Sequence, residues 1–205
     1  MQPAPSEGVD LTVAVIGLVG VIVGAIIAAA AQWLMQVRAE KQERAYVTSN
    51  LVAALDQLAI DCCHVAQDDG TDCGHPDEDR RHSIRVANPE FALSSEQANL
   101  RHLDSATTYS VLIIPHRIKS IAHTVSNVFE YDDLPDFQHG FEERQYLFAQ
   151  LGRDVAKLSD QIRREHKIPH RPHDIWNPVP DLQDMIALID GRREKRSKSL
   201  GHSQF

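Results

Sequence analysis

The feature that most constrains this chain is an uninterrupted apolar run near its amino terminus. The 21 residues from Leu11 to Ala31 include a single polar side chain, that of Thr12. As a helix this run would be about 31 Å long, close to the hydrocarbon thickness of a bilayer, about 30 Å. A helix is also the only single-segment structure that satisfies every backbone N–H and C=O group in lipid. The run therefore predicts a transmembrane helix over residues 11–35, preceded by a short extracytoplasmic segment, residues 1–10.

The alternative is a secretory leader that is cut away, because Ala29-Ala30-Ala31 offers the small residues that a signal peptidase accepts. Two features oppose it. The first ten residues contain Glu7 and Asp10 and no Lys or Arg, so the positively charged start of a leader is missing. The apolar run is also longer than the usual 7 to 15 residues or so. A retained anchor is the favoured interpretation.

Charged and aromatic residues after the run predict its orientation. Arg38, Lys41 and Arg44 follow the span, whereas no basic residue precedes it. Since cytoplasmic flanks carry an excess of Lys and Arg, the amino terminus is expected outside and residues 36 onward in the cytoplasm. Trp33 lies where an interfacial aromatic side chain belongs.

Small residues recur at helical spacing within the predicted span. Gly17, Gly20, Gly24 and Ala28 include a Gly-xxx-Gly-xxx-Ala pattern, along which a second backbone can approach closely. The pattern predicts a homodimer packed through this face. The alternative is that Gly and Ala are simply common in transmembrane helices.

Beyond the span, apolar residues recur with helical periodicity and predict an all-α domain over residues 36–190. One stripe comprises Val47, Leu51, Leu55, Leu58, Cys62 and Val65, and the later stripes comprise Val111, Ile114, Ile118, Ile121, Val125 and Val128, then Phe148, Leu151, Val155, Leu158 and Ile162. Ser94-Ser95-Glu96-Gln97 reads as a capping box that opens a short helix through Leu103. A last short helix is expected from about Asp181 to Gly191.

Helices with one apolar stripe each can bury it only against one another, which predicts an antiparallel cytoplasmic helical bundle. The alternative is a parallel coiled coil between subunits. The connecting loops and the shortness of each heptad run favour the bundle within one chain.

Two segments are expected outside this core. Residues 67–89 hold six acidic residues and few large apolar ones, which predicts a mobile acidic loop. Residues 191–205 predict a basic disordered tail with five cations for anionic lipid headgroups, Arg192, Arg193, Lys195, Arg196 and Lys198. The alternative is a tail that is only solvated.

Composition excludes some classes of protein. The formal net charge of −8 argues against a nucleic-acid-binding protein, because such domains are usually basic. Three cysteines, an odd number, do not suggest a disulfide-stapled secreted domain. A reducing cytosol fits better.

Cysteine and histidine cluster in one short segment. Cys62-Cys63-His64 is followed by Cys73-Gly74-His75, and four such ligands would hold a tetrahedral zinc. The spacing is poor for a metal, because adjacent helical residues point about 100° apart and no C-x-x-C pair occurs. The alternative is that Cys62 continues the apolar stripe as a small hydrophobe.

No familiar catalytic motif is present. The chain lacks G-x-S-x-G, H-E-x-x-H and the Gly-rich phosphate loop, and its acidic clusters do not match an EF-hand register. No catalytic residue is therefore predicted. A hydrolase site assembled from several helices stays an open alternative.

The order of these segments resembles that of uncharacterised bacterial single-pass membrane proteins with a helical cytosolic domain. The segments that carry the resemblance are the Gly-rich span, QWLMQVRAEKQERAYVTSNLVAALDQLAIDCCHVAQDDG, IIPHRIKSIAHTV and IWNPVPDL. The resemblance implies a bacterial inner-membrane location and carries over no catalytic residue.

Together these features predict a non-enzymatic membrane-anchored interaction or accessory module. Its expected partners are the lipid bilayer, a second copy of the chain and an unidentified protein. The alternative is a membrane-tethered metal or thiol-redox sensor that uses the Cys/His cluster.

Overall fold

The computed structural model describes residues 7–72, 74–75, 81–93, 100–133, 135–172 and 174–202. The side chains of residues 7–17, 19, 20, 22, 23 and 200–202 lie outside this description. The expected capping box at Ser94–Gln97 and the candidate ligand Cys73 also lie outside it. Within these ranges the chain is all-α, as predicted, with one isolated β-bridge between Asp72 and His75.

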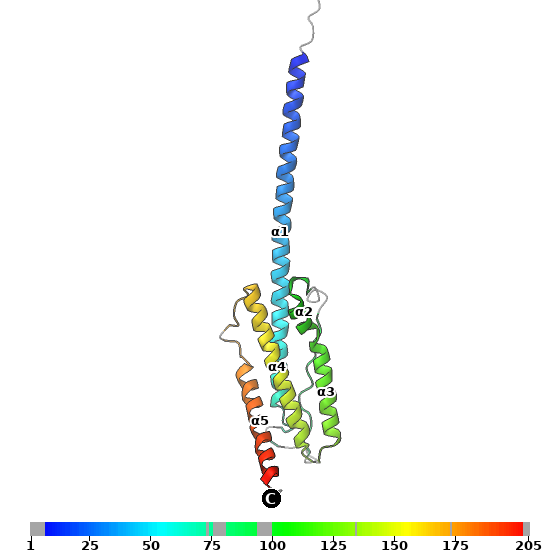
Figure 1. Cartoon of the computed structure of the whole chain (residues 1–205), viewed down its shortest axis with the longest axis vertical. Coiled ribbons are helices and arrows are strands. Elements are labelled where there is room, and N and C mark those ends of the chain that lie inside the picture. The colour runs from blue at the N-terminus through cyan, green and yellow to red at the C-terminus, as the bar shows by residue number, and fades with distance from the viewer. Residues whose placement is uncertain are drawn as a thin grey trace, which may run out of the picture. The chain divides into compact units, whose positions relative to one another are not determined.

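Five α-helices and one short 3-10 helix make up the described structure (Figure 1). Their bounds in chain order are α1 Glu7–Gln67, η1 Leu100–His102, α2 Ser105–Leu112, α3 Ile114–Glu130, α4 Gln138–His166 and α5 Val179–His202. The chain divides into two compact units, Met1–Tyr46 and Val47–Phe205. Helix α1 contributes to both.

The first unit contains the predicted membrane span. Its described side chains from Gly24 to Gln36 are all exposed. Among the side chains that the structure describes, no helix offers a stretch long and apolar enough to cross a membrane. Much of the predicted span, including Leu11–Gly17, lies outside that set.

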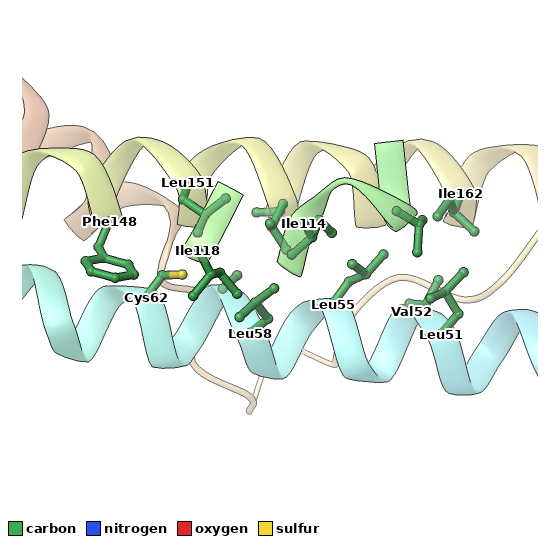
Figure 2. Packing of buried hydrophobic residues seen from close by; sticks show 14 of the residues in the cluster. Leu51, Val52, Leu55, Leu58, Cys62, Ile114, Ile118, Phe148, Leu151 and Ile162 are labelled. Carbon is green, nitrogen blue, oxygen red and sulfur yellow. The ribbon is translucent and has the colours of Figure 1, made fainter. Parts of the chain in front are cut away.

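The second unit is a helical bundle whose core consists of the predicted stripes. Apolar residues of α1 and α4 share one buried cluster, and Figure 2 shows Phe148 beside Cys62 at one end of it and Ile162 near Leu51 at the other. Most positions of these stripes are less than 10% exposed, which confirms the prediction, whereas Ile121, Val128 and Leu158 are only partly buried. The buried positions are Val47, Leu51, Leu55, Leu58, Cys62, Val65, Val111, Ile114, Ile118, Val125, Phe148, Leu151, Val155 and Ile162.

Helix α4 is central to this unit and runs antiparallel to its neighbours. Asp56 of α1 contacts Ser159 of α4, and Cys62, further along α1, lies beside Gly152, which is earlier in α4. The two helices therefore run in opposite directions. Figure 1 shows α4 between α3 and α5, and both of these helices contact it. The antiparallel prediction is therefore confirmed for this pair of helices.

The second predicted stripe is divided between two helices. Helix α2 ends at Leu112, and α3 begins at Ile114 with Pro115 in its first turn. Proline suits that position because its missing N–H has no intrahelical partner there. Asp104 caps α2, and its carboxylate accepts hydrogen bonds from the N–H groups of Ala106 and Thr107.

The predicted end of the last helix is wrong. The last helix begins at Val179 and continues to His202, past the expected end at Gly191. The tail expected to be disordered is therefore helical through His202, and residues 203–205 lie outside the described ranges. The physical reason is that cations of this segment pair with acidic residues of α4, as described below.

The segment at residues 67–89, expected to be a mobile loop, makes buried contacts where the structure describes it. Asp68 is buried and hydrogen-bonded, and Pro89 is buried as well. Residues 73 and 76–80 of this loop lie outside the described ranges. Composition indicated mobility, but one buried ion pair fixes the segment.

Candidate functional site

The two adjacent cysteines lie on α1 and face different apolar clusters. Cys62 packs in the main core with Leu58 and Phe148. Cys63 packs with Ala149 of α4 and Leu182 of α5. Both thiols are buried, which agrees with the interpretation of Cys62 as part of the apolar stripe. Their divergence follows from the rotation of about 100° between neighbouring helical residues.

Burial also makes both thiols poor nucleophiles. Desolvation, reinforced by the nearby Asp61 carboxylate, raises the pKa of Cys62 far above its ordinary value. Desolvation and then the Asp181 charge raise the pKa of Cys63 to about 11. Since the thiolate is the reactive and metal-binding form, these positions oppose redox chemistry at neutral pH.

The histidines of the predicted cluster are exposed and separate. The His64 ring stacks on the indole of Trp176, with ring centroids 5.8 Å apart and planes 13° apart. His75 forms a backbone bridge with Asp72. In the part of the chain that the structure describes, no group of three or more His, Cys, Asp or Glu residues could hold a metal ion. Because Cys73 lies outside that part, zinc binding stays a prediction.

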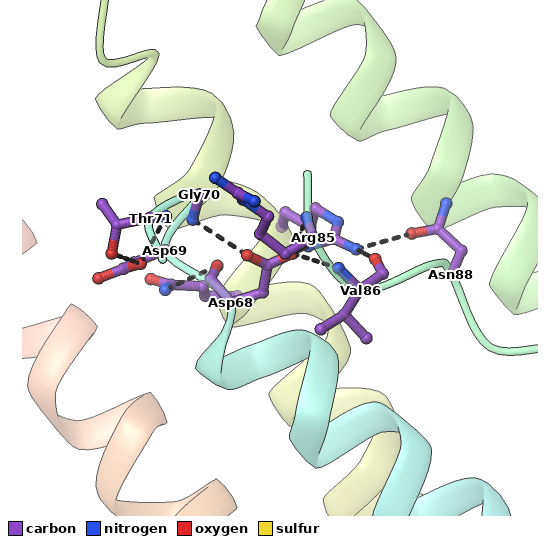
Figure 3. A network of polar contacts seen from close by, with 9 residues as sticks. Asp68, Asp69, Gly70, Thr71, Arg85, Val86 and Asn88 are labelled. Atoms are coloured by element: carbon purple, nitrogen blue, oxygen red, sulfur yellow. Dashed lines mark hydrogen bonds and ion pairs between the residues drawn. The ribbon is translucent and has the colours of Figure 1, made fainter. Parts of the chain in front are cut away.

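The most buried polar cluster joins Asp68 to Arg144 (Figure 3). Arg144 of α4 donates through Nη1 to Asp68 Oδ2 at 2.9 Å, and through Nη2 to the carbonyl of Val86. The same carboxylate accepts backbone N–H bonds from Gly70 at 3.0 Å, from Arg85 at 3.0 Å and from Val86 at 2.9 Å. One carboxylate therefore fastens α1, α4 and the segment at residues 85–88 together.

Electrostatics at this cluster indicate a structural role. Burial lowers the pKa of Arg144, and the adjacent Asp68 carboxylate opposes that shift by favouring the charged guanidinium. The Nε atom of Arg144 is buried and has no hydrogen-bond partner among the residues that the structure describes. The burial of Arg144 has a signal in the sequence. Arg144 is three residues after Phe141 and four before Phe148, so helical spacing places it on the apolar face of α4.

A second polar cluster is centred on Asp56 of α1. Its Oδ1 accepts a hydrogen bond from Ser159 Oγ at 2.7 Å. The same oxygen forms an ion pair with Arg171 Nη2 at 2.8 Å. Its Oδ2 accepts from Arg163 Nη2. Arg163 also donates through Nη1 to the carbonyl of Pro169 at 2.7 Å, so the segment after α4 is tied to both helices.

The Asp56 cluster lines a groove of about 360 Å³, hereafter the Asp56 groove. It lies between α1 and the segment that follows α4, and it combines the charged cluster with an apolar wall. The lining residues are Ser49, Val52, Ala53, Asp56, Gln57, Ile60, Arg163, Ile168, Arg171, Pro172 and Ile175. This groove has no signal in the sequence, because its residues come from three separate segments.

The predicted lipid-binding cations divide into two groups. Arg193 pairs with Glu143 at 2.6 Å and lies 4.2 Å from the ring centroid of Tyr146, and Arg196 pairs with Glu142. Lys198 pairs with Glu194 one helical turn away. Arg192 and Lys195 are exposed.

These cations lie at one end of the second unit. Glu142 is near the start of α4, which runs antiparallel to α1 and therefore lies near the end of α1 at Gln67. The basic end of α5 is consequently at the opposite end of the bundle from Val47. Contact of this end with lipid stays a prediction.

The residues predicted at the membrane interface are exposed where the structure describes them. This holds for Trp33, Arg38, Lys41 and Arg44. Of the predicted packing face, Ala28 is exposed, and a Cβ at Gly24 would meet nothing within 4 Å. The surroundings of Gly17 and Gly20 lie outside the description.

A further apolar surface lies on α2, hereafter the α2 surface. Tyr109 and Leu112 are 66% and 53% exposed, and they line an open pocket of about 650 Å³ together with Leu100 and Leu103. Large apolar side chains exposed side by side commonly mark a contact surface. This surface was not predicted from the sequence.

Comparison with known proteins adds no relative to these observations. No protein-family model, no curated protein and no solved structure matches this chain.

Proposed function

We propose that this chain is a single-pass protein of the bacterial inner membrane, with its amino terminus outside and its helical bundle in the cytoplasm. In this proposal the bundle acts as a non-enzymatic interaction or accessory module that the anchor holds at the membrane.

The observation that carries the anchor proposal is the exposure of large apolar side chains around the first part of α1. Leu18, Val21, Ile26, Ile27, Trp33, Leu34 and Met35 are between 49% and 70% exposed. Neighbours such as Ile26 and Ile27 point about 100° apart, so these residues are not confined to one face. A helix that is apolar all round requires an apolar environment from outside the chain. The apolar sequence from Leu11 to Ala31 is long enough for that environment to be a bilayer.

The interaction role rests on the character of the bundle surface. The α2 surface presents an aromatic and an aliphatic side chain around an open pocket. Aromatic residues are enriched in protein interfaces. The unidentified protein partner of this proposal would bind there.

Self-association through the anchor is part of the same proposal. The Gly20-xxx-Gly24-xxx-Ala28 face permits close approach of two helices, because small residues let backbones come together. The open space around Gly24 within one chain is compatible with a second copy.

The metal or thiol-redox sensor is the weaker candidate. Two of its three cysteines are buried in separate apolar clusters, and their raised pKa values oppose thiolate formation. Stoichiometric zinc in the purified full chain that is lost in a Cys63→Ser, Cys73→Ser variant would reverse this ranking.

Fractionation and topology reporters test the anchor. The full chain is expected to stay with membranes through an alkaline carbonate wash, and a reporter fused after Phe205 is expected to be active only if it is a cytosol-active type. Val21→Arg with Ile27→Arg should weaken insertion, because each Arg near the centre of a span costs about 2.5 to 3.5 kcal/mol. The matched control is Val21→Leu with Ile27→Leu. A full-length soluble product, or a mature chain beginning at Gln32, would contradict the proposal.

Affinity capture from native membranes in mild detergent tests the interaction role. A specific partner is expected to be recovered with the wild-type chain and lost with Tyr109→Ser and Leu112→Ser. Lys119→Ser serves as the control, because Lys119 is exposed on α3 and does not line the α2 pocket. Equal recovery of the partner with the wild type, with the Tyr109→Ser, Leu112→Ser double variant and with Lys119→Ser would exclude the α2 surface as the binding site.

A further inference from the structure

The Asp56 groove combines an apolar wall with an unequal number of opposite charges. Val52, Ala53 and Ile60 of α1 form one side, and Ile168 and Ile175 of the segment after α4 form the other. All of these residues belong to the second unit. The groove volume, about 360 Å³, falls within the usual range of small-molecule sites, roughly 300 to 1,000 Å³.

The charge imbalance arises because two arginines share one carboxylate. Arg163 and Arg171 both pair with Asp56, and among the described residues neither has a second carboxylate partner. The cluster therefore carries one positive charge in excess. The three side chains are only 11% to 17% exposed, so water screens this excess less than it would at the surface.

The two guanidinium groups retain donors for a further acceptor. A guanidinium has five N–H donors in a planar fork. The described hydrogen bonds use Nη1 and Nη2 of Arg163, toward Pro169 and Asp56. Arg171 donates through Nη1 to the Trp176 carbonyl, and its Nη2 forms the ion pair with Asp56. Each terminal nitrogen carries two N–H groups, and both arginines line the groove.

We propose that the Asp56 groove binds a small amphipathic carboxylate, with the carboxylate at Arg163 and Arg171 and a short hydrocarbon chain along Ile60, Ile168 and Ile175. Carboxylates are the planar anions that a guanidinium fork binds best, and an aliphatic chain of about eight carbons suits the volume and the apolar wall. The anion would balance the excess positive charge. This site is independent of the anchor and of the α2 surface.

The competing explanation is that the Asp56 cluster only fastens the segment after α4 to the bundle. In that case the groove would not discriminate an anion from a neutral molecule of the same length. The charge of the ligand, and a charge placed in the groove, therefore separate the two explanations.

The test uses octanoate as the probe and the full chain in a nonionic detergent. Binding is measured by equilibrium dialysis of isotopically labelled octanoate, with octanol, octylamine and acetate as competitors. Octanoate is expected to bind saturably. Octanol and octylamine are expected to bind at least about tenfold more weakly because they lack the carboxylate, and a charge-assisted hydrogen bond contributes roughly one factor of ten. Acetate is expected to bind at least about tenfold more weakly because it lacks the hydrocarbon chain, each buried methylene of which contributes about 0.8 kcal/mol.

The informative variant is Ala53→Glu, with Ala53→Gln as its matched control. Ala53 is exposed and lines the groove, so either side chain can be accommodated without opening the core. A carboxylate placed there supplies the missing negative charge and should weaken octanoate binding at least about tenfold relative to Ala53→Gln. Partition of octanoate into detergent is the same for both variants and cancels in the comparison.

A second pair of variants tests the arginines directly. Arg171→Gln should weaken octanoate binding to the same extent, whereas Arg164→Gln should not, because Arg164 is exposed on α4 and does not line the groove. Three results would overturn the proposal: no saturable binding of octanoate, octanol binding as tight as octanoate, or equal affinities for Ala53→Glu and Ala53→Gln.

Discussion

Arg144 and Asp68 form an ion pair at 2.9 Å between side chains that are 0% and 1% exposed, although 76 residues separate them in the chain. A buried charge that loses its partner is strongly destabilising, by about 3 to 5 kcal/mol. This pair therefore makes the segment after α1 part of the folded core.

The first prediction concerns this pair. Asp68→Asn should lower the free energy of unfolding by about 3 to 5 kcal/mol, because the Arg144 charge would stay buried without its counter-charge. Chemical denaturation followed by circular dichroism measures the change. Asp69→Asn, at an exposed neighbouring position, is the control and should cost less than about 1 kcal/mol.

A double variant checks the cause. Asp68→Asn combined with Arg144→Met removes both charges and should be less destabilising than Asp68→Asn alone. If the double variant is the less stable of the two, the cost lies in packing or in lost hydrogen bonds, and not in an unpaired charge.

The second prediction concerns the close approach of α1, α4 and α5 at Gly152. A Cβ at this position would lie 2.8 Å from Cys62 Cβ and 3.1 Å from Leu182 Cδ1. Gly152→Ala should therefore destabilise the bundle by about 1 to 3 kcal/mol through overpacking, less the gain in helix propensity of up to about 1 kcal/mol.

Gly191 offers a matched control for this substitution. It lies within α5, and a Cβ there would meet nothing within 4 Å. Gly191→Ala should therefore be neutral or stabilising by up to about 1 kcal/mol. Thermal unfolding of both variants measures the difference, and a stabilising Gly152→Ala would contradict the close packing of the three helices.

The third prediction concerns the pH dependence of stability through the thiol of Cys63. Desolvation and then the Asp181 charge raise the pKa of this thiol from an ordinary value of 9.0 to about 11 in the folded protein. Between these values the folded state holds a proton that the unfolded state releases, so stability falls as pH rises through this window. Below the ordinary value of 9.0 the thiol is protonated in both the folded and the unfolded state, so this loss of stability does not occur.

Thiol titration and denaturation at several pH values check this prediction. Cys63→Ser should flatten the decline in stability between about pH 9 and pH 11 relative to wild type. Native Cys63 should also resist modification by a thiol reagent at pH 8, since reaction requires the thiolate. Rapid modification of the folded chain at that position would show that the thiol is accessible.

The fourth prediction concerns the attachment of α5 to α4. Arg193→Gln and Arg196→Gln together should increase amide hydrogen exchange in α5 after Ile189, because they remove the ion pairs with Glu142 and Glu143. The expected loss of stability is about 1 kcal/mol and should diminish with added salt. Arg192→Gln with Lys195→Gln, at exposed positions, should leave exchange unchanged.

The sequence alone determined the helical class and the buried faces of the longer helices. A helical repeat of apolar residues requires only local information, because the 3.6-residue period places those residues on one side of a helix. The stripe from Val47 to Val65 and the stripe from Phe148 to Ile162 are therefore both correct.

Only the tertiary structure decided which polar residues are buried and paired. The sequence predicted a mobile acidic loop and a disordered basic tail, but Asp68 pairs with Arg144, and Arg193 and Arg196 pair with acidic residues of α4. The Asp56 groove likewise requires α1, α4 and the following segment to meet. Charge pairing acts across the folded chain and leaves no local period in the sequence, so packing must place the partners before their attraction can be recognised.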